Sequence, residues 1–377
     1  MRVVVAIDSF KGSLSSLQAG SAVKEAVSRL CQAAEVIVKP LADGGEGTVE
    51  ALASGLESEL VAVDVHGPLM NSVKAQYCIL KDSNTAVIEM AAASGITLIS
   101  QQQRNPLKTT TYGVGELILD AINRGCRRFI IGIGGSATND GGTGMLAALG
   151  FEFLDQDNMP ISLGAEGLES LCKISTEKVI PQLAECTFHI ACDVKNPLCG
   201  TNGCSWVYGP QKGATPEMIT QMDSWLESYA EIAKTVSAKV DKNYEGAGAA
   251  GGLGFAFLSF TNATLQSGID IVLQEIKLEE DIKSADIVVT GEGRLDSQTV
   301  MGKAPIGVAK LAKKYGKKVI AFCGCTTADA DVCNDHGIDA FFPILRSVTT
   351  LEEALDMKNA YDNLRATAYQ VFRLIQG

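Results

Sequence analysis

A glycine-rich turn is the first place in the sequence where the backbone itself could bind a ligand. An apolar run leads into the turn and a helical pattern follows it. Glycines let an oxyanion approach the main chain, and free N–H groups at the start of a helix point at the anion with the favourable end of the helix dipole. The residues that we expect to bind phosphate here are Gly134, Gly135, Ser136, Thr138 and Asn139.

The same turn has two other interpretations. It fits the GxGxxA pattern of a dinucleotide-binding fold, with Asp155 about 20 residues further on. Residues 139–142 would then fall in the first turns of the helix, where glycines destabilise and Asp140 would lie near a pyrophosphate. A tight turn between strand and helix is the other interpretation, although such a turn needs one or two glycines and this segment has five.

Charged side chains follow two apolar strands, at the edge where ligands of an open parallel sheet collect. Asp8, Ser9 and Lys11 come after the first strand, and Asp43 and Glu46 come after the second. Carboxylate oxygens suit magnesium, and a lysine offers a point charge to a phosphate or a carboxylate. The structural alternatives are that Asp8 caps its turn and that Lys11 lies in solvent.

Two later segments repeat this arrangement. Asp193 follows one apolar strand, and Glu292, Arg294 and Asp296 follow another, with Lys303 just before a helix. The arginine fork can bind a carboxylate through two parallel hydrogen bonds. The alternative is a surface Glu–Arg pair with Lys303 in solvent.

Short β-branched runs alternate with helical stretches along the whole chain, which predicts an α/β fold with parallel sheets. The expected strands are Val3–Ile7, Val36–Val38, Phe129–Ile133, Phe188–Cys192, Ile287–Thr290, Val319–Phe322 and Phe341–Pro343.

Three helices are indicated by their ends. One begins at Pro305 and stops at Gly316, and a capping box of Thr350 and Glu353 begins the last helix. A long helix begins after Thr215, and its apolar spacing favours a core-facing helix over a coiled coil. The apolar positions are Ile219, Met222, Leu226, Tyr229, Ala233, Val236 and Val240.

The length of 377 residues is typical of two domains. Because the strands near the two chain ends are similar in character, we expect one Rossmann-like α/β domain with a mainly parallel sheet from residues 1–65 and 280–377. Residues 66–279 would form an inserted α/β domain. Within it, the glycine- and alanine-rich stretch 246–254 either contacts a ligand or packs backbone against backbone.

Composition excludes several classes of protein. A net charge of −12 without a cluster of Lys and Arg argues against nucleic-acid binding. The first apolar stretch is too short for a signal sequence and no later window suits a membrane span, so we expect a cytoplasmic protein that binds no membrane. The 11 cysteines are odd in number and lack a CxxC pair, which indicates core residues instead of disulfides.

Six sequence blocks occur in order across nearly the whole chain: DSFKGS, PLADGGEGT, GIGGSATNDGG, CDVKNPL, GAGAAGGLGFAF and TGEGRLDSQT. Together they resemble the bacterial glycerate kinase family that lacks a P-loop. The resemblance implies two unlike α/β domains with the active site in the cleft between them. It also implies ATP as phosphoryl donor and D-glycerate as acceptor, with 2- or 3-phosphoglycerate as product.

Phosphoryl transfer depends on alignment and charge neutralisation, and the residues named above suit both tasks. As a hypothesis, Asp193 or Asp296 orients the glycerate hydroxyl, and Lys11 and Arg294 face the glycerate carboxylate or the γ-phosphate. We expect ATP at Gly134, Gly135, Ser136, Thr138, Asn139 and Lys303; Mg²⁺ at Asp43, Glu46 and Asp140; and glycerate at Asp8, Ser9, Lys11, Glu292 and Arg294.

Two rival functions remain. An NAD(P)-dependent dehydrogenase would use the GxGxxA turn, and a non-catalytic anion-binding protein would bind glycerate without turnover. A homo-oligomer is compatible with either function and with the kinase.

Overall fold

The computed structural model describes residues 1–42 and 47–376. By its internal contacts the chain divides into two compact units: unit 1 comprises residues 1–56 and 269–377, and unit 2 comprises residues 57–268. The domain boundaries predicted from the sequence lie near 65 and 280. The first boundary lies after residue 56 instead, because strand β3 (Ser58–His66) pairs with β4 (Ser72–Leu80) of unit 2.

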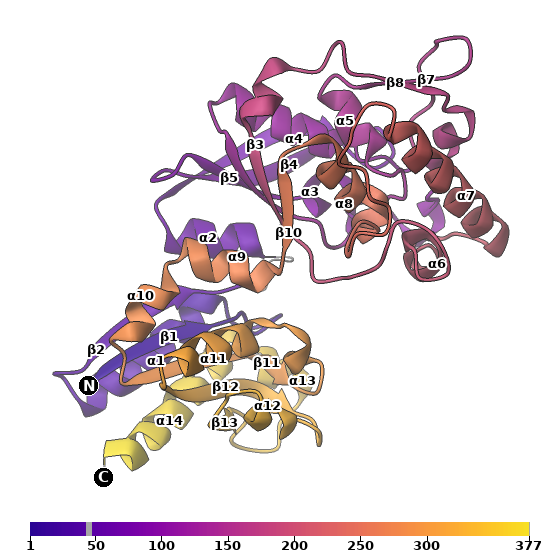
Figure 1. Cartoon of the computed structure of the whole chain (residues 1–377). Coiled ribbons are helices and arrows are strands. Elements are labelled where there is room, and N and C mark those ends of the chain that lie inside the picture. Colours follow the sequence, from indigo (N-terminus) through magenta and orange to yellow (C-terminus); the bar gives the residue numbers. More distant parts are fainter. Residues whose placement is uncertain (43–46, 377) are drawn as a thin grey trace. The chain divides into compact units, whose positions relative to one another are not determined.

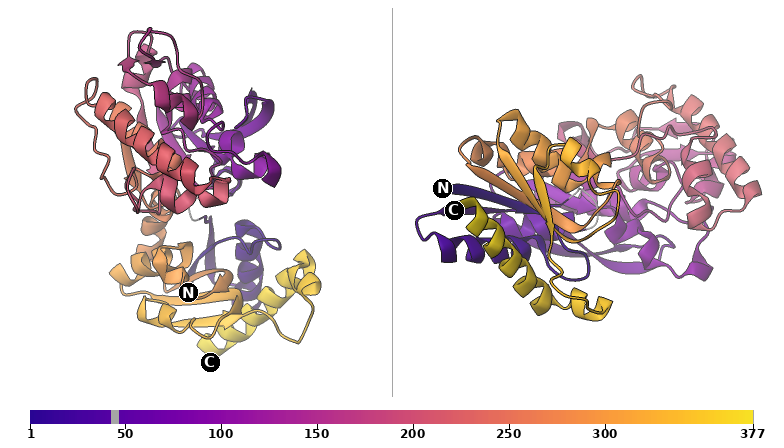
Figure 2. Two further views of the ribbon diagram at one scale, coloured as in Figure 1. Left: turned by 90° about the vertical axis from the view of Figure 1, so that its right-hand side faces the viewer. Right: turned by 90° about the horizontal axis from the view of Figure 1, so that it is seen from below.

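Unit 1 contains a five-stranded sheet in which every pairing is parallel, in the order β13-β12-β11-β1-β2 (Figure 1). The two central strands, β1 and β11, come from opposite ends of the chain, and both views of Figure 2 show the indigo and the orange-to-yellow segments side by side. The strands are β1 (Arg2–Ile7), β2 (Glu35–Pro40), β11 (Ile287–Leu295), β12 (Lys318–Thr326) and β13 (Ala340–Pro343).

Helices cover both faces of this sheet, because nearly every side chain of β1 is buried and each face needs an apolar cover. On one face, Val3 and Val5 pack against α1 (Ser16–Leu30) and α14 (Met357–Gln376). On the other face, α11 (Ala304–Lys314) contacts β1, β11 and β12. The remaining helices of this unit are α2 (Thr48–Gly55), α9 (Gly268–Glu275, from the last residue of unit 2), α10 (Leu278–Lys283), α12 (Val332–Asp335) and α13 (Leu351–Leu355).

Unit 2 contains a mixed six-stranded sheet in the order β10-β9-β6-β5-β4-β3. Strands β5, β6, β9 and β10 are parallel, while β3, β4 and β5 form an antiparallel meander. The bounds not yet given are β5 (Thr85–Glu89), β6 (Arg128–Gly132), β9 (Thr187–Ala191) and β10 (Ala263–Gln266), with β7 (Glu152–Leu154) and β8 (Lys173–Ser175) in a separate two-stranded sheet.

The helices of unit 2 surround one large apolar core. Helix α7 begins at the capping residue Thr215 as predicted and turns Ile219, Met222 and Leu226 inward, but it ends at Ala233. The predicted apolar seam is therefore a core-facing helix, and Val236 lies beyond it. The helices are α3 (Ala91–Ser94), α4 (Tyr112–Asn123), α5 (Thr143–Ala148), α6 (Cys204–Tyr208), α7 (Pro216–Ala233) and α8 (Ala249–Phe260).

The predicted α/β class is confirmed, with a parallel sheet built from both chain ends and a second sheet built from the middle of the chain. Across the described chain, no helix is both long and apolar enough to cross a membrane.

Candidate active site

A cavity of about 400 Å³ lies in unit 1 at the carboxyl ends of β1 and β11. Strand β1 continues to β2 on one side, whereas β11 continues to β12 and β13 on the other, so the strand order reverses between them. In open α/β sheets, ligands bind outside the carboxyl ends of the strands at such a switch point. The cavity is lined by the predicted substrate residues Asp8, Ser9, Lys11, Glu292 and Arg294, together with Lys303.

Lys303 lies with these residues, in unit 1, and not in the unit that carries the glycine turn with which the sequence grouped it. A smaller cavity of about 90 Å³ adjoins the same strand end. Asp8 and Ser9 line both cavities, and Glu50 lines the smaller one.

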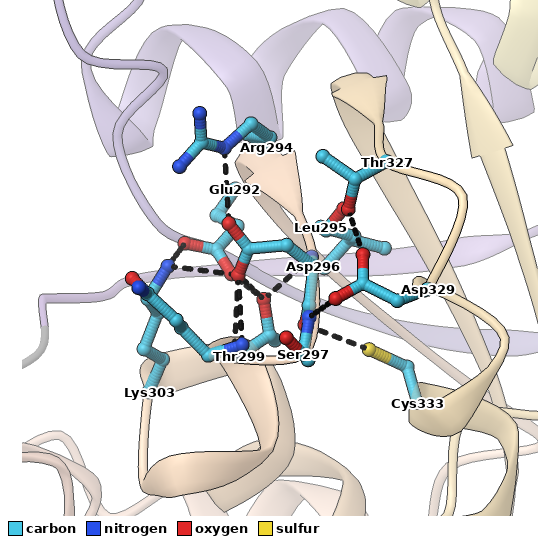
Figure 3. Close-up of polar contacts among 11 residues, drawn as sticks. Glu292, Arg294, Leu295, Asp296, Ser297, Thr299, Lys303, Thr327, Asp329 and Cys333 are labelled. Atoms are coloured by element: carbon cyan, nitrogen blue, oxygen red, sulfur yellow. Dashed lines mark hydrogen bonds and ion pairs between the residues drawn. The ribbon is translucent and has the colours of Figure 1, made fainter.

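Glu292 is a buried charged group at the large cavity, with 9% of its surface exposed, as is Asp8. Oγ1 of Thr299 donates to its Oε1 across 2.7 Å, and Nζ of Lys303 lies 3.4 Å from its Oε2 (Figure 3). Burial raises the pKa of Glu292, and the hydrogen bond from Thr299 and the charge of Lys303 oppose that rise. The carboxyl is thus held in place by a neutral donor and a cation.

Asp296 anchors the turn that follows β11. Its Oδ1 accepts hydrogen bonds from the backbone N–H groups of Gln298 at 3.0 Å and Thr299 at 3.2 Å. Its Oδ2 accepts from Nε of Arg294 at 3.0 Å. The side chain of Arg294 is 57% exposed and that of Asp296 only 8%. Asp296 is therefore placed to orient the arginine.

One wall of the large cavity is apolar. Ile344 is buried there, but Leu345, Leu351 and Leu355 remain exposed, Leu351 by 75%. Apolar side chains that line a hollow and face solvent indicate contact with a ligand or partner. This wall was not predicted from the sequence, because its residues come from the loop and short helix after β13.

The glycine turn follows β6 in unit 2. Ala137 N donates to Ser94 O at 2.9 Å and Gly135 O accepts from Ile96 N at 2.8 Å, which fixes both sides of the turn. The N–H groups of Gly134, Gly135 and Ser136 donate to no acceptor within the described residues. Both glycines are exposed to solvent, so the turn presents unpaired donors.

Lys212, which the sequence analysis missed, supports this turn from inside. The residue ends the 3-10 helix η5 (Pro210–Lys212) and is 2% exposed. Nζ donates to the carbonyl oxygen of Thr138 at 2.6 Å and to Oγ of Ser136 at 2.9 Å. The only local signal was a lysine followed by a glycine in a turn, which usually indicates a solvated side chain.

Asp140, one of the three predicted magnesium ligands, is fully buried. Its Oδ2 accepts from the N–H of Thr111 at 2.8 Å and from the Thr111 hydroxyl at 2.9 Å, and its Oδ1 accepts from Gly142 N at 3.1 Å. Burial raises the pKa of Asp140, against these hydrogen bonds. These hydrogen bonds fit a structural role, and the metal-binding role of Asp140 stays a prediction.

The other two predicted ligands, Asp43 and Glu46, lie outside the described residues. Within residues 1–42 and 47–376, no group of three or more His, Cys, Asp or Glu side chains is arranged to hold a metal ion.

Asp193 follows β9 in unit 2, is exposed, and ties this strand end to that of β10. Its Oδ1 accepts from the Ser267 hydroxyl at 2.9 Å and from Gly268 N at 3.2 Å. The predicted residues that the structure describes thus fall into two sets. Asp193, Asp140 and the glycine turn lie in unit 2, and the predicted substrate residues lie in unit 1 with Asp296 and Lys303.

The stretch 246–254 packs backbone against backbone. A Cβ on Gly251 would lie 2.1 Å from the carbonyl oxygen of Thr138, and one on Gly252 would lie 2.8 Å from Cα of Gly141. Gly251 and Gly252 also have positive φ angles, of 68° and 92°. Of the two roles considered for this stretch, the structure shows close packing beneath the glycine turn.

The dinucleotide interpretation required Asp155 to end a neighbouring parallel strand. Instead, Asp155 follows β7, which pairs only with β8, and its Oδ1 accepts from Asp157 N and Met159 N within a tight turn. The turn after β6 also runs for ten residues before α5 begins. Asp155 therefore does not have the position that the dinucleotide interpretation requires.

Comparison with known proteins agrees with the motifs. The glycerate kinase family matches residues 3–376. A Haemophilus influenzae protein named glycerate kinase is 47% identical over 100% of this chain and 99% of its own length. An Escherichia coli K12 protein named glycerate 2-kinase is 47% identical over 97% of this chain and 95% of its own length.

A crystal structure of a Salmonella typhimurium LT2 protein, provisionally named glycerate kinase 2, shares the fold. It superposes with a TM-score of 0.92 at 46% identity, covering 100% of this chain and 98% of that one. The family match and these full-length relatives together show that the chain belongs to the glycerate kinase family.

Proposed function

We propose that the protein transfers the γ-phosphoryl group of ATP to D-glycerate. The observation that carries this proposal is the cavity at the switch point of unit 1, where Lys11, Arg294 and Lys303 offer three cations beside the buried carboxyl of Glu292. A small hydroxy acid and a phosphoryl group are both anions, and catalysis of the transfer depends on aligning them and neutralising their charge.

Arg294 and Lys11 would bind the glycerate carboxylate. Asp296 acts on Arg294 as a positioning residue, because its oxygens already accept from Arg294, Gln298 and Thr299. Of the two aspartates considered for the glycerate hydroxyl, Asp193 is the more exposed, and we assign that role to it.

The N–H groups of the glycine turn would bind ATP phosphates. Their donors are unpaired within the described residues, as phosphate binding requires. The apolar wall at Leu345 and Leu351 favours a second allocation, in which the cavity of unit 1 takes the purine base of ATP. In the first arrangement Arg294 contacts glycerate, and in the second it contacts ATP. The effect of Arg294→Lys on the KM for each substrate distinguishes the two.

Magnesium is expected of a kinase, where it neutralises charge on the phosphates. Asp140 does not fit such an ion, because hydrogen bonds occupy both of its oxygens. The metal-binding role is left to Asp43 and Glu46.

We further propose the 2-hydroxyl as the acceptor, so that the product is 2-phosphoglycerate. The support is the name of the Escherichia coli relative, glycerate 2-kinase. A cytoplasmic location and a homo-oligomeric assembly stay predictions.

Incubation with ATP, magnesium and D-glycerate, followed by phosphorus NMR of the product, tests both proposals. A doublet from a phosphate on a CH group would identify 2-phosphoglycerate, and a triplet from a phosphate on a CH₂ group would identify the 3-isomer. Binding of glycerate without any ester signal would instead support the non-catalytic alternative.

A further inference from the structure

Lys212 is a buried cation that no carboxylate of the described residues contacts. Its ammonium bonds only to the carbonyl oxygen of Thr138 and to Oγ of Ser136, and it forms no ion pair with a carboxylate of the described chain. Burying a charge without a counter-charge is costly, and an unmatched buried cation is therefore uncommon. Its position beneath the glycine turn calls for an explanation.

The hydrogen bonds have only one possible direction. An ammonium group carries donors and no acceptor, so Oγ of Ser136 must accept from Lys212. The hydroxyl hydrogen of Ser136 is then available for a second acceptor. No acceptor for it lies within hydrogen-bond range among the described residues. Lys212 thereby leaves the hydroxyl of Ser136 as a donor without a partner in the described part of the chain.

This hydroxyl joins a turn whose N–H groups are also without acceptors in the described residues. The N–H groups of Gly134, Gly135 and Ser136 are unpaired in the part of the chain that the structure describes, and both glycines are exposed. Four donors with a cation behind them are complementary to an oxyanion.

The groups around Lys212 leave its charge in place at neutral pH. Burial lowers the pKa of Lys212 to about 8, while Cys204 and Asp140 raise it. The thiol of Cys204, on α6, has a pKa of about 11 because it is buried, so it is neutral in this range. Asp140 lies in the turn itself, and its oxygens are taken up by hydrogen bonds from Thr111, Gly142 and Gly144.

We propose that Lys212 is a positioning residue for substrate: through the hydroxyl of Ser136 it completes an oxyanion site on the glycine turn, and this site binds a phosphate of ATP. The inference rests on the proposed kinase activity. It adds a buried side chain to a site that otherwise consists of backbone donors.

A double-mutant cycle tests the relay. Lys212→Met keeps the length and apolar stem of the side chain but removes the charge, and Ser136→Ala removes only the hydroxyl. We expect each variant to weaken ATP binding about tenfold, as loss of a charge-assisted hydrogen bond would. Because both act through one contact, the double variant should lose no more than either single variant. Lys178→Met, which removes an exposed lysine of the same unit, is the matched control.

The binding measurement is isothermal titration with ATP, and separately with D-glycerate and inorganic phosphate, at pH 7.5. Weaker binding of ATP and inorganic phosphate with unchanged glycerate binding supports the proposal. Loss of glycerate binding alone, or independent additive losses in the cycle, overturns it. If Lys212→Met does not fold, Ser136→Ala decides the outcome. Unchanged ATP affinity in Ser136→Ala would show that Lys212 does not act on ATP through the Ser136 hydroxyl.

A pH series distinguishes this role from a purely structural one. The wild-type affinity for inorganic phosphate should fall between pH 7.5 and 9.5, as Lys212 loses its proton, and Lys212→Met should show no such fall. Equal slopes in both proteins would contradict the proposal. Wild-type protein that produces no phosphoglycerate by phosphorus NMR would instead disprove the kinase activity, which is a separate outcome.

Discussion

Nε of Arg294 donates to Oδ2 of Asp296 across 3.0 Å, and this contact holds the guanidinium by one nitrogen. The two terminal nitrogens form no ion pair within the described residues. They are therefore available to bind a carboxylate in a bidentate manner.

Arg294→Lys should raise the KM for glycerate about tenfold and leave the KM for ATP within about twofold, because an ammonium cannot reproduce the planar fork. Steady-state kinetics with each substrate varied in turn gives both constants. Arg365→Lys, a surface change in the same unit, is the control. A larger effect on ATP would assign the cavity and its apolar wall to the nucleotide.

Thr299→Val removes the donor to Oε1 of the buried Glu292. We expect a loss of about 1–3 kcal/mol in the free energy of unfolding, measured by urea denaturation at pH 7, because the buried Oε1 of Glu292 and the N–H of Asp296 both lose their partner. Thr349→Val, at an exposed Thr–Glu contact, should cost much less. An equal loss of unfolding free energy in both variants would show that the hydrogen bond from Thr299 to Glu292 does not stabilise the fold.

The same variant has a predictable effect on pH dependence. Burial raises the pKa of Glu292 above 4.5. Between pH 4.5 and this raised pKa the folded state binds more protons than the unfolded state, so the free energy of unfolding falls as the pH rises through that range. Removing the Thr299 hydrogen bond raises this pKa further. If the charged carboxylate is needed for activity, the acid limb of the kcat/KM profile should move to higher pH in Thr299→Val.

The two exposed glycines of the turn should respond differently to alanine. Gly134 has an ordinary φ and no atom within 4 Å of an added Cβ, whereas Gly135 has a φ of +73°. Gly134→Ala should keep the melting temperature but weaken ATP binding, because the methyl group occupies the anion's place. Gly135→Ala should also lose about 1 kcal/mol of stability. Unchanged ATP affinity in both variants would show that the turn binds no phosphate.

Asp140→Asn places an amide where both carboxylate oxygens accept hydrogen bonds. We expect a loss of at least ~3 kcal/mol in stability, with the magnesium dependence of the remaining activity unchanged. Asp43→Asn should show the opposite, with turnover lost and the melting temperature kept. Magnesium titrations of activity, together with thermal melts, compare the two variants. A shifted magnesium requirement in Asp140→Asn would restore Asp140 as a ligand.

The parallel strands were predictable from sequence because each is a compact run of β-branched and aromatic residues. All seven predicted segments overlap strands of the structure. The meander of β3 and β4 was not found, since polar and charged residues interrupt the apolar residues of Ser58–His66 and Ser72–Leu80. The long helix was predicted beyond its end, because Val236 continues the spacing after the chain has turned at Ala233.

Site residues were predictable where they follow strands, as Asp8, Lys11 and Arg294 do. Lys212 was not, because its burial depends on Thr138 and Ser136, which lie more than 70 residues away in sequence. The structural role of Asp140 likewise depends on a threonine 29 residues before it. Such long-range partners leave no local periodicity that a sequence pattern could reveal.

The pairing of β1 with β11 has a consequence for how the chain is synthesised. Arg2 donates to Asp286, 284 residues further along, and Val3 lies in register with Ile287. At ribosomal rates of about 5–20 residues per second, β1 waits roughly 15 to 60 s for this neighbour. By the end of that interval the whole of unit 2 has been synthesised, whereas Val3 and Val5, fully buried in the end, still lack β11 on one side. The nascent N-terminal segment is thus a natural client for a chaperone, and this kinase should lose solubility most readily while its last third is still being translated.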